Sequence, residues 1–146
     1  MSVTQPGAYA LTWEKMFIDT AAQTMEAETH KEALIADSET PDFDLDDFRD
    51  DITEVTGSNY SSGGVTVTGT EWTIAAGLMT FDMTDTVYTN VTLAGVMAGI
   101  FFFNVGSAAT DQLLLLQDFV TAVGPTAADL TIQHAGAGVA TLDHTI

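Results

Sequence analysis

Short runs of β-forming residues, separated by turn residues, make up almost the whole chain after Gly57. Valine and threonine alternate strictly in Val65–Gly69, and Val87–Leu93 alternates in a similar way, as in strands with one buried face. Gly95–Val105 and Leu113–Val120 are almost continuously apolar, which is typical of strands buried on both faces. This texture predicts a mainly β chain, built as a single antiparallel β-sandwich or barrel-like domain. The remaining short strands are expected at Trp72–Ile74, Leu78–Met83, Asp129–Gln133 and Val139–His144.

Acidic residues gather in the first part of the chain. Fourteen of the 21 lie between Glu14 and Glu54. The sequence therefore divides into an acidic helical and loop part, residues 1–56, and a β-rich part, residues 57–146. No linker separates the two parts, so we expect one domain over residues 1–146.

An N-terminal helix is expected within the acidic part. Trp13, Phe17 and Ala21 recur at helical spacing, and Thr12 stands where a residue could cap the first turn. Lys31–Ala36 also consists largely of helix-forming residues, so propensity alone favours helix there as well.

A loop or a single helical turn is expected over residues 38–51. This segment holds Pro41 and six aspartates, and both residue types favour turns over regular structure. Three apolar side chains interrupt the acids, and we expect Phe43, Leu45 and Phe48 to hold the loop against the core.

The same loop offers the only candidate metal ligands that spacing suggests. Asp42, Asp44 and Asp46 alternate as the first oxygen ligands of a calcium loop do. An EF-hand would then need Gly and Glu where this chain has Asp47 and Thr53, so the motif fails at both diagnostic positions. The three aspartates are therefore weak candidates for a cation site. The alternative is a solvated loop that attracts loosely bound salt cations.

The net charge of the chain is −18, because only Lys15, Lys31 and Arg49 oppose the 21 acids. A compact chain of one sign repels itself unless salt screens the charges, so the composition indicates a halophilic host. Three cations cannot form a basic patch, so neither nucleic acid nor an anionic membrane is expected as a direct partner. An apolar content of 46% argues against disorder in spite of the charge.

No catalytic constellation stands out, and we predict that the chain is not an enzyme and has no cofactor. His30, His134 and His144 are scattered, and we expect them at the surface or in hydrogen bonds. Pairs of acids carry no weight as a signal, since 21 acids must produce some close pairs by chance. Asn59 and Asn90 both begin N-glycosylation sequons, and whether either is modified stays open.

Four segments carry a resemblance to a known family. The segments are Ala33–Asp44, Asp47–Ile52, Glu54–Gly69 (EVTGSNYSSGGVTVTG) and Asp129–Leu142 (DLTIQHAGAGVATL). In this order they are similar to a small virion structural protein of tailed bacteriophages, which is head-associated or decorates the capsid. The resemblance implies that Lys31–Ala36 is a strand rather than a helix.

The resemblance implies a structural virion protein that decorates or cements the capsid or forms a capsid turret. Its partners would be the major capsid protein and copies of itself, as a trimer or pentamer, with the host surface as a further possibility. It would be assembled in the host cytoplasm and reside on the capsid surface of the virion. The scarcity of Lys and Arg departs from the family and points to a tailed virus of a halophilic, and in our reading archaeal, host.

The alternative function is a tail or baseplate component, or a module of the virion that binds the host surface. Tyr60, Trp72 and Tyr88 could then serve as aromatic platforms for surface glycans. The competing interpretation of these three residues is ordinary core packing.

Overall fold

The computed structural model describes residues 7–9 and 29–143. The predicted N-terminal helix, with Trp13, Phe17 and Ala21, lies outside these residues. The described residues confirm a mainly β chain with antiparallel strands; their one helical element is a 3-10 turn at Arg49–Asp51. None of the described residues forms a helix of the length and apolarity needed to cross a membrane.

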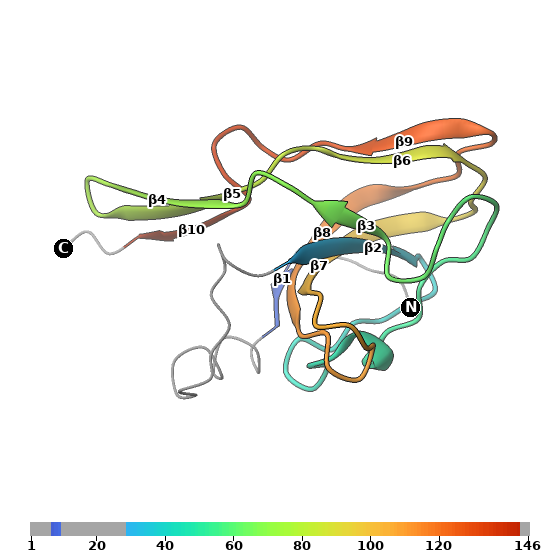
Figure 1. Ribbon diagram of the computed structural model, residues 1–146, viewed down its shortest axis with the longest axis horizontal. Helices are drawn as coiled ribbons and strands as arrows, with labels where there is room; N and C mark the ends of the chain where they lie inside the picture. Colours follow the sequence, from blue (N-terminus) through green and yellow to red (C-terminus); the bar gives the residue numbers. More distant parts are fainter. Residues whose placement is uncertain (1–6, 10–28, 144–146) are drawn as a thin grey trace.

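Five strands form the largest sheet, in the order β1-β8-β7-β2-β3, and every neighbouring pair is antiparallel. Two smaller sheets accompany it, one with the order β10-β5-β4 and one made of β6 and β9 (Figure 1). The strands of the largest sheet are β1 (Gly7–Ala8), β2 (His30–Ala36), β3 (Val65–Val67), β7 (Val96–Phe103) and β8 (Leu113–Val123). The other strands are β4 (Glu71–Ala75), β5 (Leu78–Asp82), β6 (Thr86–Val91), β9 (Ala128–Ile132) and β10 (Ala140–Asp143).

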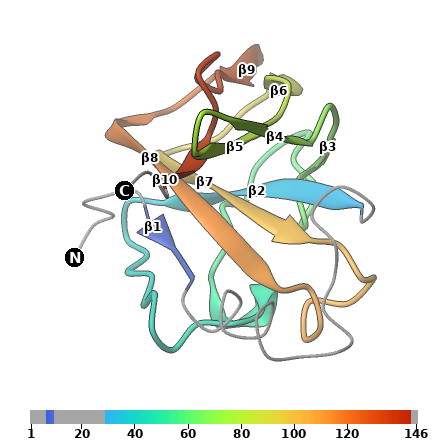
Figure 2. The same cartoon turned by 90° about the vertical axis from the view of Figure 1, so that its left-hand side faces the viewer.

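Both faces of the largest sheet are covered, which explains why β7 could be read as continuously apolar. All eight residues of β7 are buried. One face packs against the acidic loop through a cluster that includes Ile35, Phe102 and Phe43. The β6–β9 pair covers part of the opposite face, where Leu34 and Tyr88 belong to one cluster (Figure 2).

The largest sheet does not close into a barrel, so the barrel-like alternative was wrong. The edge strands of the largest sheet are β1 and β3, and they lie at opposite ends of the strand order without pairing to each other. The sheet is therefore open, and its coverage comes from separate layers. The strand alternative for Lys31–Ala36 is confirmed, because β2 lies between β7 and β3.

The turn-rich segment before β3 depends on a glycine. Gly64 has φ +62, and a Cβ atom there would overlap the carbonyl oxygen of Glu32 on β2. The close approach allows β3 to pair with β2, with Val65 opposite Glu32. Glycine therefore serves two needs here, a left-handed backbone and contact between two main chains.

Strands β4, β5 and β10 form a three-stranded ribbon, which we call the arm. Figure 1 shows the arm extending beyond the edge of the largest sheet. Its base packs on that sheet through a cluster that includes Phe81, Phe101 and Leu115, with Trp72 against it.

Candidate functional site

The aspartates of the acidic loop close their own turn. Asp42 Oδ1 accepts hydrogen bonds from the backbone N–H groups of Asp44, at 3.0 Å, and Leu45, at 3.2 Å. Asp46 Oδ2 accepts a bond of 2.7 Å from the N–H of Asp42. Within the described ranges, no three His, Cys, Asp or Glu side chains gather as a metal site would require. The structure thus brings Asp42 and Asp46 together as turn acceptors, and Asp44 stays exposed.

Phe43 is the main contact between the acidic loop and the core, among the three residues expected to hold the loop. Phe43 packs edge-on against Tyr9, with ring centroids 5.3 Å apart. The prediction for Leu45 was wrong, because its side chain is 73% exposed at the tip of the Asp42–Asp46 turn. Phe48 is half-buried, and its backbone forms a bridge with Gln112.

Arg49 is the centre of a polar cluster that joins residues 49–63 to Asp111, which is distant in sequence. Its Nε donates to Asp111 Oδ2 at 3.0 Å, and its Nη1 donates to Glu54 Oε1 at 2.8 Å. Glu54 also accepts bonds from the hydroxyl of Tyr60, at 2.7 Å, and from the backbone N–H of Gly63. Every group in the cluster has a partner of opposite polarity, which is the condition under which buried charge is tolerated.

This cluster explains the motif on which the family resemblance rests. The Tyr60 hydroxyl accepts a bond of 3.0 Å from the backbone N–H of Leu34 on β2 while it donates to Glu54. Asp111 Oδ1 accepts bonds from the N–H groups of Val105 and Gly106 in a second loop. The cluster is therefore structural, and its contacts offer no free nucleophile or acid.

A second polar cluster lies buried between the sheets, and the sequence analysis missed it. Glu32 on β2 is 1% exposed, and burial raises the pKa of its carboxyl to about 7. His134, whose side chain is also 1% exposed, lies with its Nε2 atom 3.1 Å from Thr86 Oγ1 and 3.8 Å from Glu32 Oε2. Burial lowers the pKa of His134, so the ring is neutral at neutral pH.

The geometry of this cluster does not match a catalytic triad. In a triad, one imidazole nitrogen faces the nucleophile and the other faces the acid. Here Thr86 and Glu32 both approach Nε2, and Nδ1 of His134 has no hydrogen-bond partner among the described residues. The arrangement cannot relay a proton through the ring from the hydroxyl to the carboxylate. The cluster can instead offer hydrogen-bonding groups to a bound molecule.

The arm presents the clearest candidate interaction surface. Trp72 and Ile74 lie on one face of β4, opposite Phe81 and Met79 of β5. Leu142 of β10 stands on the other side of Met79 and extends the same row. Trp72 and Phe81 belong to the core at the base, whereas Ile74 is 69% and Leu142 50% exposed. One continuous apolar face is therefore core at its base and uncovered by described residues toward its tip.

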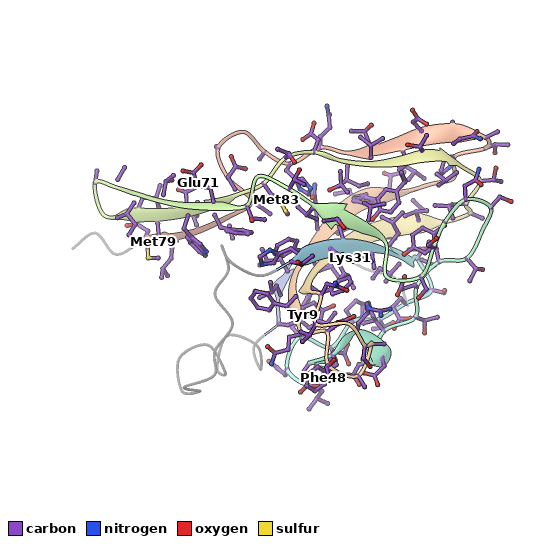
Figure 3. All side chains as sticks on the ribbon, viewed as in Figure 1. Tyr9, Lys31, Phe48, Glu71, Met79 and Met83 are labelled. Carbon is purple, nitrogen blue, oxygen red and sulfur yellow. The ribbon has the colours of Figure 1, made fainter. Side chains whose placement is uncertain are left out.

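The face of the arm that carries this row has no acidic residue, because the acids of the arm, Glu71, Asp82 and Asp143, lie at the alternate positions of their strands, on the other face. No charged residue occurs from Trp72 to Phe81, in a chain with 21 acids. Glu71 lies at the base of β4, on the face opposite Met79 (Figure 3). An exposed face that is apolar and uncharged is typical of a surface that becomes buried in a complex.

The other candidate residues occupy structural positions. Tyr88 is 2% exposed and stacks on Tyr60 with centroids 5.9 Å apart, and Trp72 packs on Phe81, so core packing is confirmed for all three aromatic candidates. His30 is buried and stacks on Phe101, so of the two roles expected for the histidines, a surface position or hydrogen bonding, the surface position does not apply to it. His134 has the hydrogen-bonding role, with Thr86.

The two sequon asparagines lie side by side. Asn59 and Asn90 are exposed, and Asn59 Nδ2 donates a bond of 2.7 Å to the carbonyl oxygen of Asn90. Both residues have positive φ, 61° for Asn59 and 51° for Asn90, so each supports a turn. His144 lies outside the described residues.

No family profile, curated protein or solved structure matches the chain. The similarity to virion proteins therefore stays a prediction.

Proposed function

We propose that the chain is a structural component of a virus particle, in which copies associate through the arm and decorate or cement the capsid. The observation that carries the proposal is the exposed apolar row of Ile74, Met79 and Leu142 on a face of the arm without acidic residues. The β-rich architecture, the rigid cluster around Arg49 and the similarity to tailed-phage virion proteins support the same reading.

A second copy of the chain is the occupant that the charges favour. Each copy carries −18, so contact between copies is least costly where neither surface is charged. The apolar face of the arm meets this condition, because the acids of the arm lie on its other face. A basic partner would be attracted to the acidic loop instead. Pairing is favoured further because β4 and β10 are the edge strands of their sheet, with backbone groups available to a neighbour.

The proposed assembly depends on a high salt concentration, which screens the repulsion between acidic copies. Like charges on neighbouring copies act over roughly 10 Å at moderate ionic strength, and over about 3 Å in molar salt. Close packing of such copies around a trimer or pentamer axis therefore requires concentrated salt. The proposed setting is a tailed virus of a halophilic host.

Electron cryo-microscopy of purified particles of the virus that encodes the chain tests the function. We expect density for this chain on the capsid surface, in repeated groups around symmetry axes, with arms of neighbouring copies in contact. Density confined to the tail would contradict the head assignment. Absence of the chain from the purified particles would contradict a virion role altogether.

A further inference from the structure

A cavity of about 360 Å³ lies at the junction between the largest sheet, the base of the arm and the segment that follows β9. Met83, Phe101, Leu115 and Val139 supply apolar walls. Glu32, Gln117 and His134 supply polar ones. The volume lies within the range of pockets that hold small molecules, and the mixture of walls is typical of them.

Each polar wall residue has one buried atom without a hydrogen-bond partner among the described residues. These atoms are Glu32 Oε2, Gln117 Oε1 and His134 Nδ1. Buried polar atoms are almost always paired, and all three of these atoms belong to residues that line one cavity, which points to an occupant there. Glu32 is 1% exposed, so bulk solvent does not replace that occupant.

The Glu32 and Gln117 oxygens are hydrogen-bond acceptors, and His134 Nδ1 is an acceptor in the tautomer that carries its hydrogen on Nε2. The Gln117 amide is oriented because its Nε2 donates to the carbonyl oxygen of Gln133 at 3.1 Å, which leaves Oε1 available. The neutral His134 ring has Nε2 beside Thr86 Oγ1, and Thr86 also hydrogen-bonds to Glu32. A hydrogen on Nε2 completes this chain, with the Thr86 hydroxyl donating to Glu32, and makes Nδ1 an acceptor.

We infer that this cavity binds a primary ammonium group on a short apolar stem. An ammonium brings three donors and one positive charge, which match three acceptors, one of them a carboxylate. The stem would lie against the apolar walls. The group could belong to a free alkylammonium ion or to a lysine side chain of a partner, and the two share the same chemistry.

The position of Glu32 is built into the sheet. Gly99 of β7 lies beside it, and a Cβ atom there would overlap Glu32 Oε1. Gly99 pairs with Gln117 on β8, so the missing side chain leaves room for the carboxylate to lie toward Gln117. The glycine thus maintains space for an acid in the middle of an otherwise apolar sheet.

Binding is measured by calorimetric titration of the full chain with n-butylammonium chloride in concentrated KCl, at constant total chloride. We expect saturable one-to-one binding, and no saturable binding of n-butanol, which has the stem without the charge. Because the background cation is potassium, the signal reports preference over potassium ion. Saturable binding of butanol with equal affinity, or no binding of butylammonium, would overturn the inference.

Two matched variants locate the site. Glu32→Gln should weaken binding at least tenfold, whereas Glu71→Gln, which removes the same charge at the base of the arm, should leave it unchanged. Glu32→Gln should fold, because the carboxyl with its raised pKa already exists in a neutral form near pH 7. Should that variant not fold, Gln117→Met removes another acceptor and should weaken binding several-fold. Equal losses in Glu32→Gln and Glu71→Gln would overturn the site.

The source of the ammonium is tested with a second probe. Nα-acetyl-lysinamide carries the same group on a peptide-like body. Tighter binding of this probe than of butylammonium identifies a partner lysine, and weaker binding identifies a free amine.

For either probe, the binding affinity should fall about tenfold per pH unit below pH 7, because the Glu32 carboxyl must be ionised. The other titratable groups near it include His134, whose Nε2 is 3.8 Å from Glu32 Oε2, and Tyr88, whose pKa Glu32 raises, while Asp85 and Asp82 raise the pKa of His134 against the effect of burial. An affinity independent of pH between 5 and 7 would contradict the role of Glu32.

Discussion

Gly64→Ala is expected to remove more than about 4 kcal/mol from the free energy of unfolding, enough to prevent folding in a protein of ordinary stability. The new methyl group would overlap the carbonyl oxygen of Glu32, a main-chain atom in the interior of β2. Relief would require β3 to move away from β2 and would break their pairing at Val65. Urea unfolding followed by circular dichroism measures the loss, in concentrated salt.

Gly95→Ala is the matched control for this variant. Gly95 has φ +61, almost the same as Gly64, but no atom lies within 4 Å of its added Cβ. We expect it to cost only the strain of a left-handed alanine, about 1–2 kcal/mol. Equal losses in the two variants would show that backbone strain, and not the contact between β2 and β3, sets the need for glycine.

Arg49→Met is expected to cost about 3 kcal/mol, because it leaves Glu54 and Asp111 without their counter-charge. The Asp111 side chain is 1% and that of Glu54 10% exposed, so water cannot replace the guanidinium fully. Loss of the cluster should also loosen the turn held by Tyr60. The same unfolding measurement gives the loss, and hydrogen exchange should rise at the N–H of Gly63, which donates to Glu54.

The control for Arg49→Met is Lys31→Met, since both variants change the net charge by the same amount. Lys31 is a half-buried residue on β2 (Figure 3), and none of the hydrogen bonds described for the cluster around Arg49 involves it. We expect a loss below about 1 kcal/mol, because a half-buried lysine keeps its ammonium group in contact with water. If both variants lost the same stability, the effect would come from total charge and not from the pairing of Arg49.

Strand positions were predictable because alternation and apolar runs are local signals. Val65–Gly69 and Gly95–Val105 contain β3 and β7, which differ from the predicted bounds by only a few residues at each end. The absence of a closed barrel was not predictable, because closure depends on which edge strands meet. Local patterns contain no such information.

The polar clusters were harder to predict because their members are distant in sequence. Arg49 meets Asp111 across 62 positions, and neither residue stands in a recognisable motif with the other. Glu32 gave one signal that could have been used, an acid two residues after His30 and directly before the apolar run Ala33–Ala36. An acid at such a place is buried with a partner or serves a site.

The arm shows a different limit of sequence reasoning. Trp72–Ile74 and Leu78–Met83 were predicted as strands, and β4 and β5 confirm them. The lack of charge from Trp72 to Phe81 was visible in the sequence, but its meaning depends on the arm extending beyond the core. Only the register, which aligns Ile74 with Met79, shows that the exposed apolar residues form one row.

Self-association through the arm is the central claim, and the native mass of the full chain, measured by light scattering in several molar KCl, tests it most directly. The wild type should form a trimer or pentamer, and Ile74→Asp should be a monomer, because it places a charge in the contact row. Val120→Asp adds the same charge at a residue that is 80% exposed outside the arm, and it should keep the wild-type mass. A monomeric wild type, or an Ile74→Asp variant with the wild-type mass, would contradict the claim.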